Sequence, residues 1–239
     1  MVKIIIITPF KTGSTTLLNI LSKIVNCETS WGHINWYKKL LLNNNFIVRH
    51  HAGHSEIKHS NYLIKDNIFD IWFTIIRKPT DIYLSGYFQD IEKKIYPYYY
   101  GDIKKVLKTD YKILLQHFLS FEWNTYNWLN YDFNFNEIYK YTNINIYDKP
   151  FNKNKGFSIY QSPTKKTKVV VLTIETLSNI NTIMTDLGYP HFKNHIKYKH
   201  NSGHRKWYKN KYSFLKKNLP KSYLLKYQKE DKKIIDHFY

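Results

Sequence analysis

A short loop of small hydroxylated residues near the start of the chain has the composition of an anion-binding site. Its residues are Lys11, Thr12, Gly13, Ser14, Thr15 and Thr16. A β-branched apolar run precedes it at residues 4–8, and a helical repeat of leucines and isoleucines begins at Leu17. The unpaired N–H groups of a first helical turn attract anions, and the helix dipole adds to this attraction. The pattern therefore predicts a phosphate site made of backbone amides, with Lys11 as a nearby cation.

The spacing separates this loop from the usual nucleotide-binding loop. That loop reads G-x-x-x-x-G-K-[ST], with the lysine after the second glycine and a Mg²⁺-binding hydroxyl behind it. Here Lys11 comes before Gly13, and the first glycine is missing. A P-loop nucleoside or polynucleotide kinase is therefore the less favoured interpretation. An ordinary Ser/Thr-rich cap of a core helix is a further alternative.

A second strand–loop–helix junction carries an arginine and a serine that suit another phosphate. The apolar run at residues 71–76 leads into R-K-P-T-D at residues 77–81, and Ser85 lies two turns into the helical pattern that follows. Proline is tolerated at a helix start, and an acid is favourable in the first turn. The planar guanidinium group can bind a phosphate through two parallel hydrogen bonds. We expect Arg77 and Ser85 to converge on one anion where α/β sheets bind ligands.

The two junctions resemble the nucleotide-binding motifs of sulfotransferases that use 3′-phosphoadenosine-5′-phosphosulfate (PAPS). K-T-G-S-T-T at residues 11–16 is similar to the 5′-phosphosulfate loop, and R-K-P-T-D-I-Y-L-S at residues 77–85 is similar to the 3′-phosphate motif. The resemblance implies a P-loop-like α/β fold with a central parallel sheet flanked by helices. It also implies that residues 11–16 hold the 5′-phosphosulfate and that Arg77 and Ser85 hold the 3′-phosphate.

Looser similarity to the family extends over most of the chain. Residues 168–177 resemble a late core strand followed by a short helix, and residues 148–160 resemble a segment of the capsular-polysaccharide-type branch. The basic stretch at residues 200–206 stands where the family has a loop that covers the nucleotide. From that loop the resemblance adds Ser202, Gly203 and Arg205 to the nucleotide-binding residues.

The group that removes the proton of the acceptor hydroxyl has several candidates. A histidine or a glutamate can accept a proton near neutral pH. The segments around His33 and His51-Ala-Gly-His54 resemble, in the same order, two segments of the glycosaminoglycan 2-O-sulfotransferases. This resemblance favours His54, whereas His51 fits only with one inserted residue. Other glycan sulfotransferases place an acid after the first helix, which makes Glu28 the competing candidate.

Length and composition fit one α/β domain. The chain has 239 residues, of which 43% are hydrophobic, enough for a single core. Apolar runs near residues 4–8, 71–76 and 169–174 predict at least three buried strands of a parallel sheet. We therefore expect a single domain over residues 1–239, with a helical, aromatic insertion around residues 89–132.

The charge balance points to anionic partners. Lys and Arg number 37 against 18 Asp and Glu, a net charge of +19. Such a field attracts the donor nucleotide or an acidic glycan, and a non-catalytic module that binds nucleic acid is the alternative. With Cys27 as the single cysteine and an irregular histidine spacing, neither a disulfide framework nor a metal site is expected. No leader peptide or membrane-spanning run is evident, so we expect a soluble cytoplasmic or otherwise intracellular protein.

The combined prediction is a PAPS-dependent sulfotransferase that acts on a hydroxyl group of a carbohydrate. The resemblance implies that the acceptor oxygen attacks sulfur and that 3′,5′-ADP leaves, with Lys11 stabilising the charge that develops on the bridging oxygen. The scheme requires no metal, and nucleic acid is not an expected partner.

Overall fold

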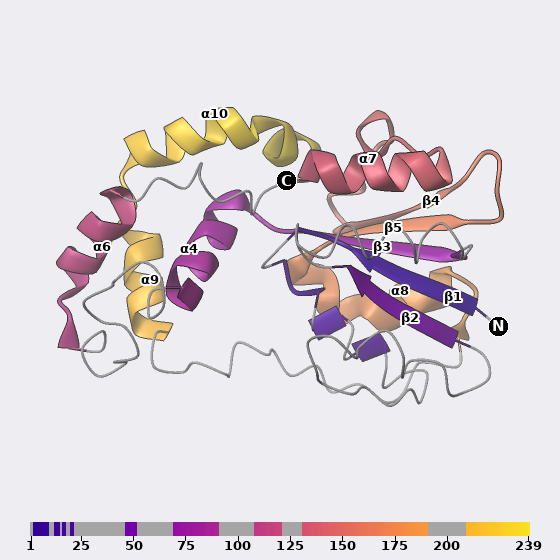
Figure 1. Ribbon diagram of the computed structural model, residues 1–239, viewed down its shortest axis with the longest axis horizontal. Coiled ribbons are helices and arrows are strands. Elements are labelled where there is room, and N and C mark those ends of the chain that lie inside the picture. Colours follow the sequence, from indigo (N-terminus) through magenta and orange to yellow (C-terminus); the bar gives the residue numbers. More distant parts are fainter. Residues whose placement is uncertain are drawn as a thin grey trace. The chain divides into compact units, whose positions relative to one another are not determined.

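The computed structural model describes nine stretches of the chain (Figure 1). They are residues 2–9, 12–14, 16–17, 20–21, 46–51, 69–90, 108–120, 131–190 and 209–239. The contacts divide the chain into two compact units. The sheet unit comprises Met1–Ile76, Asn130–Lys199 and His237–Tyr239, and the helical unit comprises Arg77–Leu129 and His200–Asp236.

The sheet unit is built on five strands in the order β2-β1-β3-β5-β4. The strands are β1 (Val2–Ile7), β2 (Phe46–His51), β3 (Ile71–Ile76), β4 (Phe157–Gln161) and β5 (Lys168–Thr173). Strands β1, β2, β3 and β5 are parallel, and β4 pairs antiparallel with β5 at the edge. All six residues of β3 are buried, as expected for a parallel strand covered on both faces. The predicted α/β class is confirmed, and the sheet predicted to be parallel is mostly so, with β4 antiparallel at its edge.

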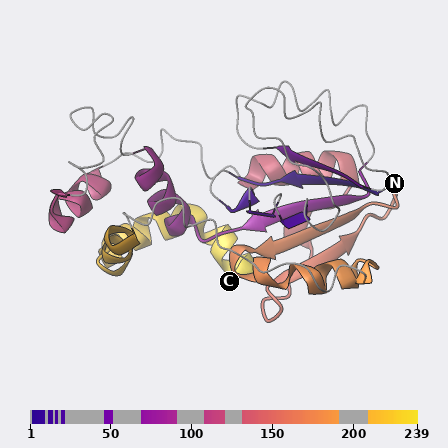
Figure 2. The same ribbon diagram turned by 90° about the horizontal axis from the view of Figure 1, so that it is seen from below.

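Helices cover both faces of this sheet (Figure 2). They include α7 (Tyr131–Thr142) and α8 (Ile180–Asp186), with two 3₁₀ turns, η5 (Ile146–Asp148) and η6 (Ile174–Asn179). On one face, Phe73 of β3 shares a buried cluster with Leu17, which follows the first loop, and with Met184 of α8. On the other face, Trp72 stacks on Tyr141 of α7, with ring centroids 5.8 Å apart. Trp72 and Phe73 are neighbours in β3, and their side chains therefore lie on opposite faces of the sheet.

The last residues of the chain complete the sheet unit. Phe238 is 1% exposed and packs its ring against Phe135, Tyr147 and Phe151. The Tyr239 hydroxyl donates to the carbonyl oxygen of Ile76, the last residue of β3, at 3.4 Å. The C-terminus is therefore a packed part of this unit rather than a loose end.

The helical unit is held together by an aromatic core. Its helices are α4 (Pro79–Asp90), α6 (Tyr111–Ser120), α9 (Lys209–Lys217) and α10 (Lys221–Phe238), the last two residues of which belong to the sheet unit. Tyr87 of α4 meets Phe118 of α6 edge to face, with centroids 5.2 Å apart, and donates its hydroxyl proton to the Leu114 carbonyl at 3.3 Å. Such aromatic pairs add directional attraction to the burial of apolar area. Leu215 of α9 completes this cluster.

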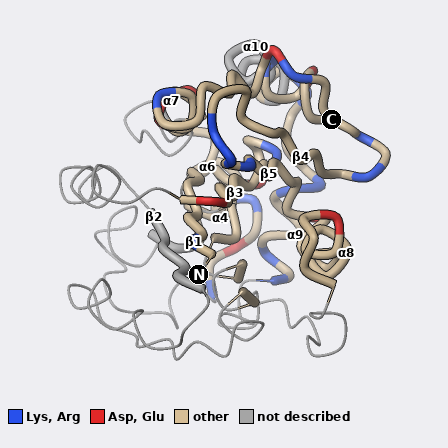
Figure 3. The backbone as a smooth tube through the Cα atoms, turned by 90° about the vertical axis from the view of Figure 1, so that its right-hand side faces the viewer, with Lys and Arg blue, Asp and Glu red and all other residues tan. Residues whose placement is uncertain are grey.

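The described part of the predicted insertion at residues 89–132 is helical at α6. The prediction that residues 1–239 form one domain stays a prediction. Lysine and arginine are spread along the described chain rather than confined to one segment (Figure 3). None of the described helices is long and apolar enough to cross a membrane.

Candidate functional site

Two threonine hydroxyls anchor the loop that follows β1. Thr8 Oγ1 donates to the Ile75 carbonyl at 2.9 Å and accepts from the Ile75 N–H at 3.2 Å, so this side chain extends the pairing between β1 and β3. Thr12 Oγ1 lies 2.7 Å from Thr8 Oγ1 and 2.7 Å from the Pro9 carbonyl oxygen. Both side chains are buried. The Thr12 hydroxyl therefore belongs to the internal scaffold of the loop, and its backbone N–H is the group that it can offer to an anion.

Gly13 forms a turn in the loop where the backbone packs closely against η6. Its φ angle is +97°, in the region that glycine adopts without steric cost. A Cβ atom at this position would lie 3.2 Å from Leu177 Cδ1 and 3.3 Å from Ile174 Cδ1. Backbone conformation and close packing therefore both call for glycine here.

The helix after the loop begins at Gly13. The Leu17 N–H donates to the Gly13 carbonyl at 3.0 Å, which makes Gly13 the N-cap and places Ser14 and Thr16 in the first turn. The N–H groups of a first turn have no acceptor within the helix, and they stand at the positive end of its dipole. The described part of the loop thus fits a bound phosphate.

The strand order places this loop at a topological switch point. From β1 the chain proceeds to β2 on one side of β1 and then to β3 on the other. In open α/β sheets, ligands bind outside the carboxyl ends of the strands where the order reverses in this way. Thr8 and Gly13 follow the carboxyl end of β1, and the Thr8 hydroxyl bonds to Ile75 near the carboxyl end of β3. Topology and local geometry therefore single out the same loop.

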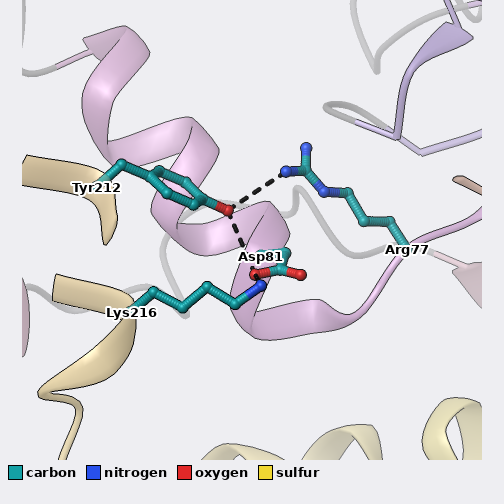
Figure 4. Close-up of polar contacts among 4 residues, drawn as sticks. All are labelled: Arg77, Asp81, Tyr212 and Lys216. Carbon is teal, nitrogen blue, oxygen red and sulfur yellow. Dashed lines mark hydrogen bonds and ion pairs between the residues drawn. The ribbon is translucent and has the colours of Figure 1, made fainter. Parts of the chain in front are cut away.

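In the helical unit, Arg77 belongs to a chain of four polar side chains (Figure 4). Arg77 Nη2 donates to the Tyr212 hydroxyl at 3.4 Å, and that hydroxyl donates to Asp81 Oδ1 at 3.3 Å. Lys216 Nζ lies 2.7 Å from the same carboxylate oxygen. Two residues of α9, one turn apart, thereby bind the first turn of α4.

Asp81 needs these partners because it is only 7% exposed. A buried carboxylate without partners loses its hydration without compensation. Lys216 supplies a positive charge, and the position of Asp81 in the first turn of α4 places it near the positive end of the helix dipole. The acid predicted to favour the start of this helix also joins α4 to α9.

Tyr212 keeps its proton at neutral pH. Burial raises the pKa of its phenol, the Arg77 charge opposes this rise, and the Asp81 carboxylate adds to it. The net shift of the pKa is upward, because burial takes the phenol out of water and disfavours its charged form. Tyr212 is therefore a neutral group that accepts from Arg77 and donates to Asp81.

Ser85 lies one helical turn beyond Asp81, on the same face of α4. Arg77 and Ser85 are both half-buried. Among the residues that the structure describes, none is hydrogen-bonded to the Ser85 hydroxyl. The two residues predicted to share one phosphate therefore belong to one unit, on either side of Asp81 in the chain.

Many of the predicted site residues lie outside the described residues. They are Lys11, Thr15, Glu28, His33, His54, Ser202, Gly203 and Arg205. His51 is described in its backbone alone, as the last residue of β2, where it pairs with Ile7. Their roles stay predictions. No group of three or more His, Cys, Asp or Glu side chains suited to a metal ion occurs in the described part of the chain.

Three residues of these sites were missed from the sequence: Thr8, Tyr212 and Lys216. Thr8 directly follows a strand, a position at which side chains of α/β proteins meet ligands and loops. Tyr212 and Lys216 carry only the weak signal of a four-residue spacing, which places them on one helix face. With 22 tyrosines in the chain, that signal does not select one of them.

Neither a family model, nor a curated protein, nor a solved structure matches this chain. Its candidate sites are accordingly defined by residues and geometry. They are the glycine-capped loop after β1 in the sheet unit and the Arg77–Tyr212–Asp81–Lys216 cluster in the helical unit.

Proposed function

We propose that this protein transfers a sulfuryl group from PAPS to a hydroxyl group of a carbohydrate. The observation that carries the proposal is the loop after β1, where a glycine-capped helix start follows a buried parallel strand at the switch point of the sheet. The order of Lys11 and Gly13 supports a phosphosulfate loop over a kinase loop. The single-domain, P-loop-like fold is part of the same proposal.

Each predicted residue has a distinct task in this proposal. The backbone N–H groups of residues 12–16 hold the 5′-phosphosulfate, and Lys11 counters the negative charge that develops on the bridging oxygen. Arg77 and Ser85 hold the 3′-phosphate through charge-assisted hydrogen bonds. PAPS, when bound, supplies the activated sulfuryl group, and 3′,5′-ADP is its product.

The proton of the acceptor hydroxyl goes to a base of the chain. His54 is the preferred base, because an imidazole can accept a proton near neutral pH, and Glu28 is the competing one. His51 and His33 are the remaining candidates. His54→Ala should remove most turnover while leaving the affinity for 3′,5′-ADP unchanged, whereas Glu28→Gln would do so if the glutamate is the base.

Ligand-dependent thermal unfolding tests the proposal directly. The purified protein is heated with 3′,5′-ADP, 5′-AMP, ATP with Mg²⁺, or a single-stranded oligonucleotide. We expect 3′,5′-ADP to raise the Tm most, because it carries the 3′-phosphate that Arg77 and Ser85 are proposed to hold. A ligand at about 100 times its Kd stabilises the native state by about 2.7 kcal/mol. Strongest stabilisation by ATP with Mg²⁺ would favour the kinase alternative, and strongest stabilisation by the oligonucleotide would favour a nucleic-acid-binding module. Transfer of radiolabelled sulfate from PAPS to a mixture of glycans then tests the reaction itself.

A further inference from the structure

Tyr212 stands between a cation and an anion that lie close together in the chain. Figure 4 shows the Arg77 guanidinium and the Asp81 carboxylate each joined to the Tyr212 hydroxyl rather than to each other. An arginine and a carboxylate within reach of one another commonly form a direct, two-pronged ion pair. Here the tyrosine hydroxyl accepts a hydrogen bond from Arg77 and donates one to Asp81, and Lys216 forms the ion pair with Asp81.

The direction of these hydrogen bonds follows from the chemistry of the groups. A guanidinium group has only donors, and an ionised carboxylate has only acceptors. The Tyr212 oxygen must therefore accept from Arg77, and its single proton is directed to Asp81. A neutral hydroxyl can do both at once, and a phenylalanine at this position can do neither.

This arrangement orients Arg77 while committing one of its donors to Tyr212. A guanidinium group has five N–H donors in a rigid fork, so the bond from Nη2 to Tyr212 limits its rotation. A side chain that is already oriented loses less conformational freedom when it binds a ligand. Lys216 lowers the attraction between Asp81 and Arg77, because it lies 2.7 Å from the carboxylate and balances its charge.

We propose that Tyr212, supported by the Asp81–Lys216 ion pair, is a positioning residue that keeps Arg77 oriented toward the 3′-phosphate of the donor nucleotide. This inference rests on the proposed function, because it takes the 3′-phosphate as the ligand of Arg77. Tyr212 acts through Arg77. Its removal should therefore affect nucleotides that carry a 3′-phosphate and leave 5′-AMP unaffected.

Tyr212→Phe is the first test. It removes the hydroxyl and keeps the ring that lies beside Phe88, with centroids 6.0 Å apart. Arg77 is then expected to pair with Asp81, and the Kd for 3′,5′-ADP should rise about tenfold, the effect of one hydrogen bond to a charged group. The Kd for 5′-AMP should stay the same. Tyr139→Phe is the matched control, because Tyr139 is 54% exposed on α7.

A rescue experiment separates positioning from a merely structural role. In Tyr212→Phe protein, the additional change Asp81→Asn removes the charge that captures Arg77, so most of the affinity for 3′,5′-ADP should return. Two independent structural losses would instead add up. Lys216→Met should weaken 3′,5′-ADP binding in the same selective way, because the uncompensated Asp81 then attracts Arg77 more strongly. Lys217→Met, at the exposed neighbouring position, is its control.

The outcomes distinguish this inference from the proposed function. If the wild-type protein prefers 3′,5′-ADP to 5′-AMP and Tyr212→Phe keeps that preference, the positioning role is overturned and the function stands. If the wild-type protein shows no such preference, the proposed function fails first. If Tyr212→Phe weakens both nucleotides equally, Tyr212 is structural. If that variant does not fold, equal affinity of Lys216→Met and Lys217→Met for 3′,5′-ADP overturns the inference.

Discussion

The loop after β1 and the Arg77 cluster are both proposed to bind a phosphate, but they are built in opposite ways. In the loop, Thr12 bonds to residues three and four positions away, and the groups offered to an anion are backbone N–H groups. In the cluster, Tyr212 bonds to Asp81 and Arg77 across 131 and 135 positions, and the functional groups are side chains. The loop should therefore be sensitive to changes of backbone shape, and the cluster to the loss of single polar atoms.

Lys11 is the side chain of the loop from which we expect the largest effect. Lys11→Met keeps the apolar stem and removes the charge, so kcat should fall by about 10²–10³ while the protein stays folded. Assays with PAPS and a glycan acceptor, together with thermal unfolding, measure both quantities. Turnover near the wild-type value would falsify the catalytic role of Lys11 and leave the loop as a purely backbone site.

Arg77→Ala tests the cluster by binding rather than by rate. Loss of a charge-assisted phosphate contact costs about 1.5–3 kcal/mol, so the Kd for 3′,5′-ADP should rise about tenfold to a hundredfold while that for 5′-AMP changes little. Calorimetric titration with both nucleotides measures the difference. Lys78→Ala, at the exposed neighbouring position, is the control. Equal losses of affinity for the two nucleotides would overturn the assignment of Arg77 to the 3′-phosphate.

Gly13→Ala tests the dependence of the loop on backbone shape, and the chain contains a matched control. Gly188 has the same φ of +97° as Gly13, but nothing lies within 4 Å of a Cβ atom built on it. Both alanine variants should lose about 1–2 kcal/mol of unfolding free energy from the left-handed conformation. Gly13→Ala should lose more, because its Cβ meets Leu177 and Ile174.

Chemical denaturation of the two variants isolates that difference. Gly13→Ala should also lose affinity for 5′-AMP, whereas Gly188→Ala should keep it. Equal stability of the two variants would show that η6 yields to the added methyl group and that the loop is less constrained than its packing indicates.

The smallest expected effect is on stability at alkaline pH. Burial raises the pKa of Tyr212 in the helical unit and of Tyr147 in the sheet unit above the ordinary value of 10.0. Above about pH 10 the unfolded chain therefore releases protons that the native protein retains, and stability falls as the pH rises. Tyr212→Phe and Tyr147→Phe should each reduce the slope of the unfolding free energy against pH by at most the contribution of one proton.

Denaturant unfolding at about pH 9 and about pH 11 measures the change in slope. A slope that does not respond to Tyr212→Phe would mean that the phenol is more accessible than its burial between Arg77 and Asp81 indicates.

The sequence by itself determined the local elements. Runs of β-branched residues of strand length predicted β1, β3 and β5, because such runs suit strands buried on both faces. Pro79 and Asp81 predicted the start of α4, and the position of Gly13 predicted a loop that opens a helix. Each of these signals depends on residues only a few positions apart, which is the range over which propensity, capping and turn chemistry act.

Only the tertiary structure decided the strand order, the antiparallel edge strand β4 and the division into two compact units. It also decided that the Thr8 hydroxyl joins the first loop to β3 and that Tyr212 and Lys216 bind Asp81. Contacts across 67 to 135 positions depend on how helices and strands pack, and a tyrosine or lysine on a helix has the same local signal whatever it packs against. For that reason Arg77 was predicted from its motif, whereas the tyrosine that accepts its hydrogen bond was found only in the folded chain.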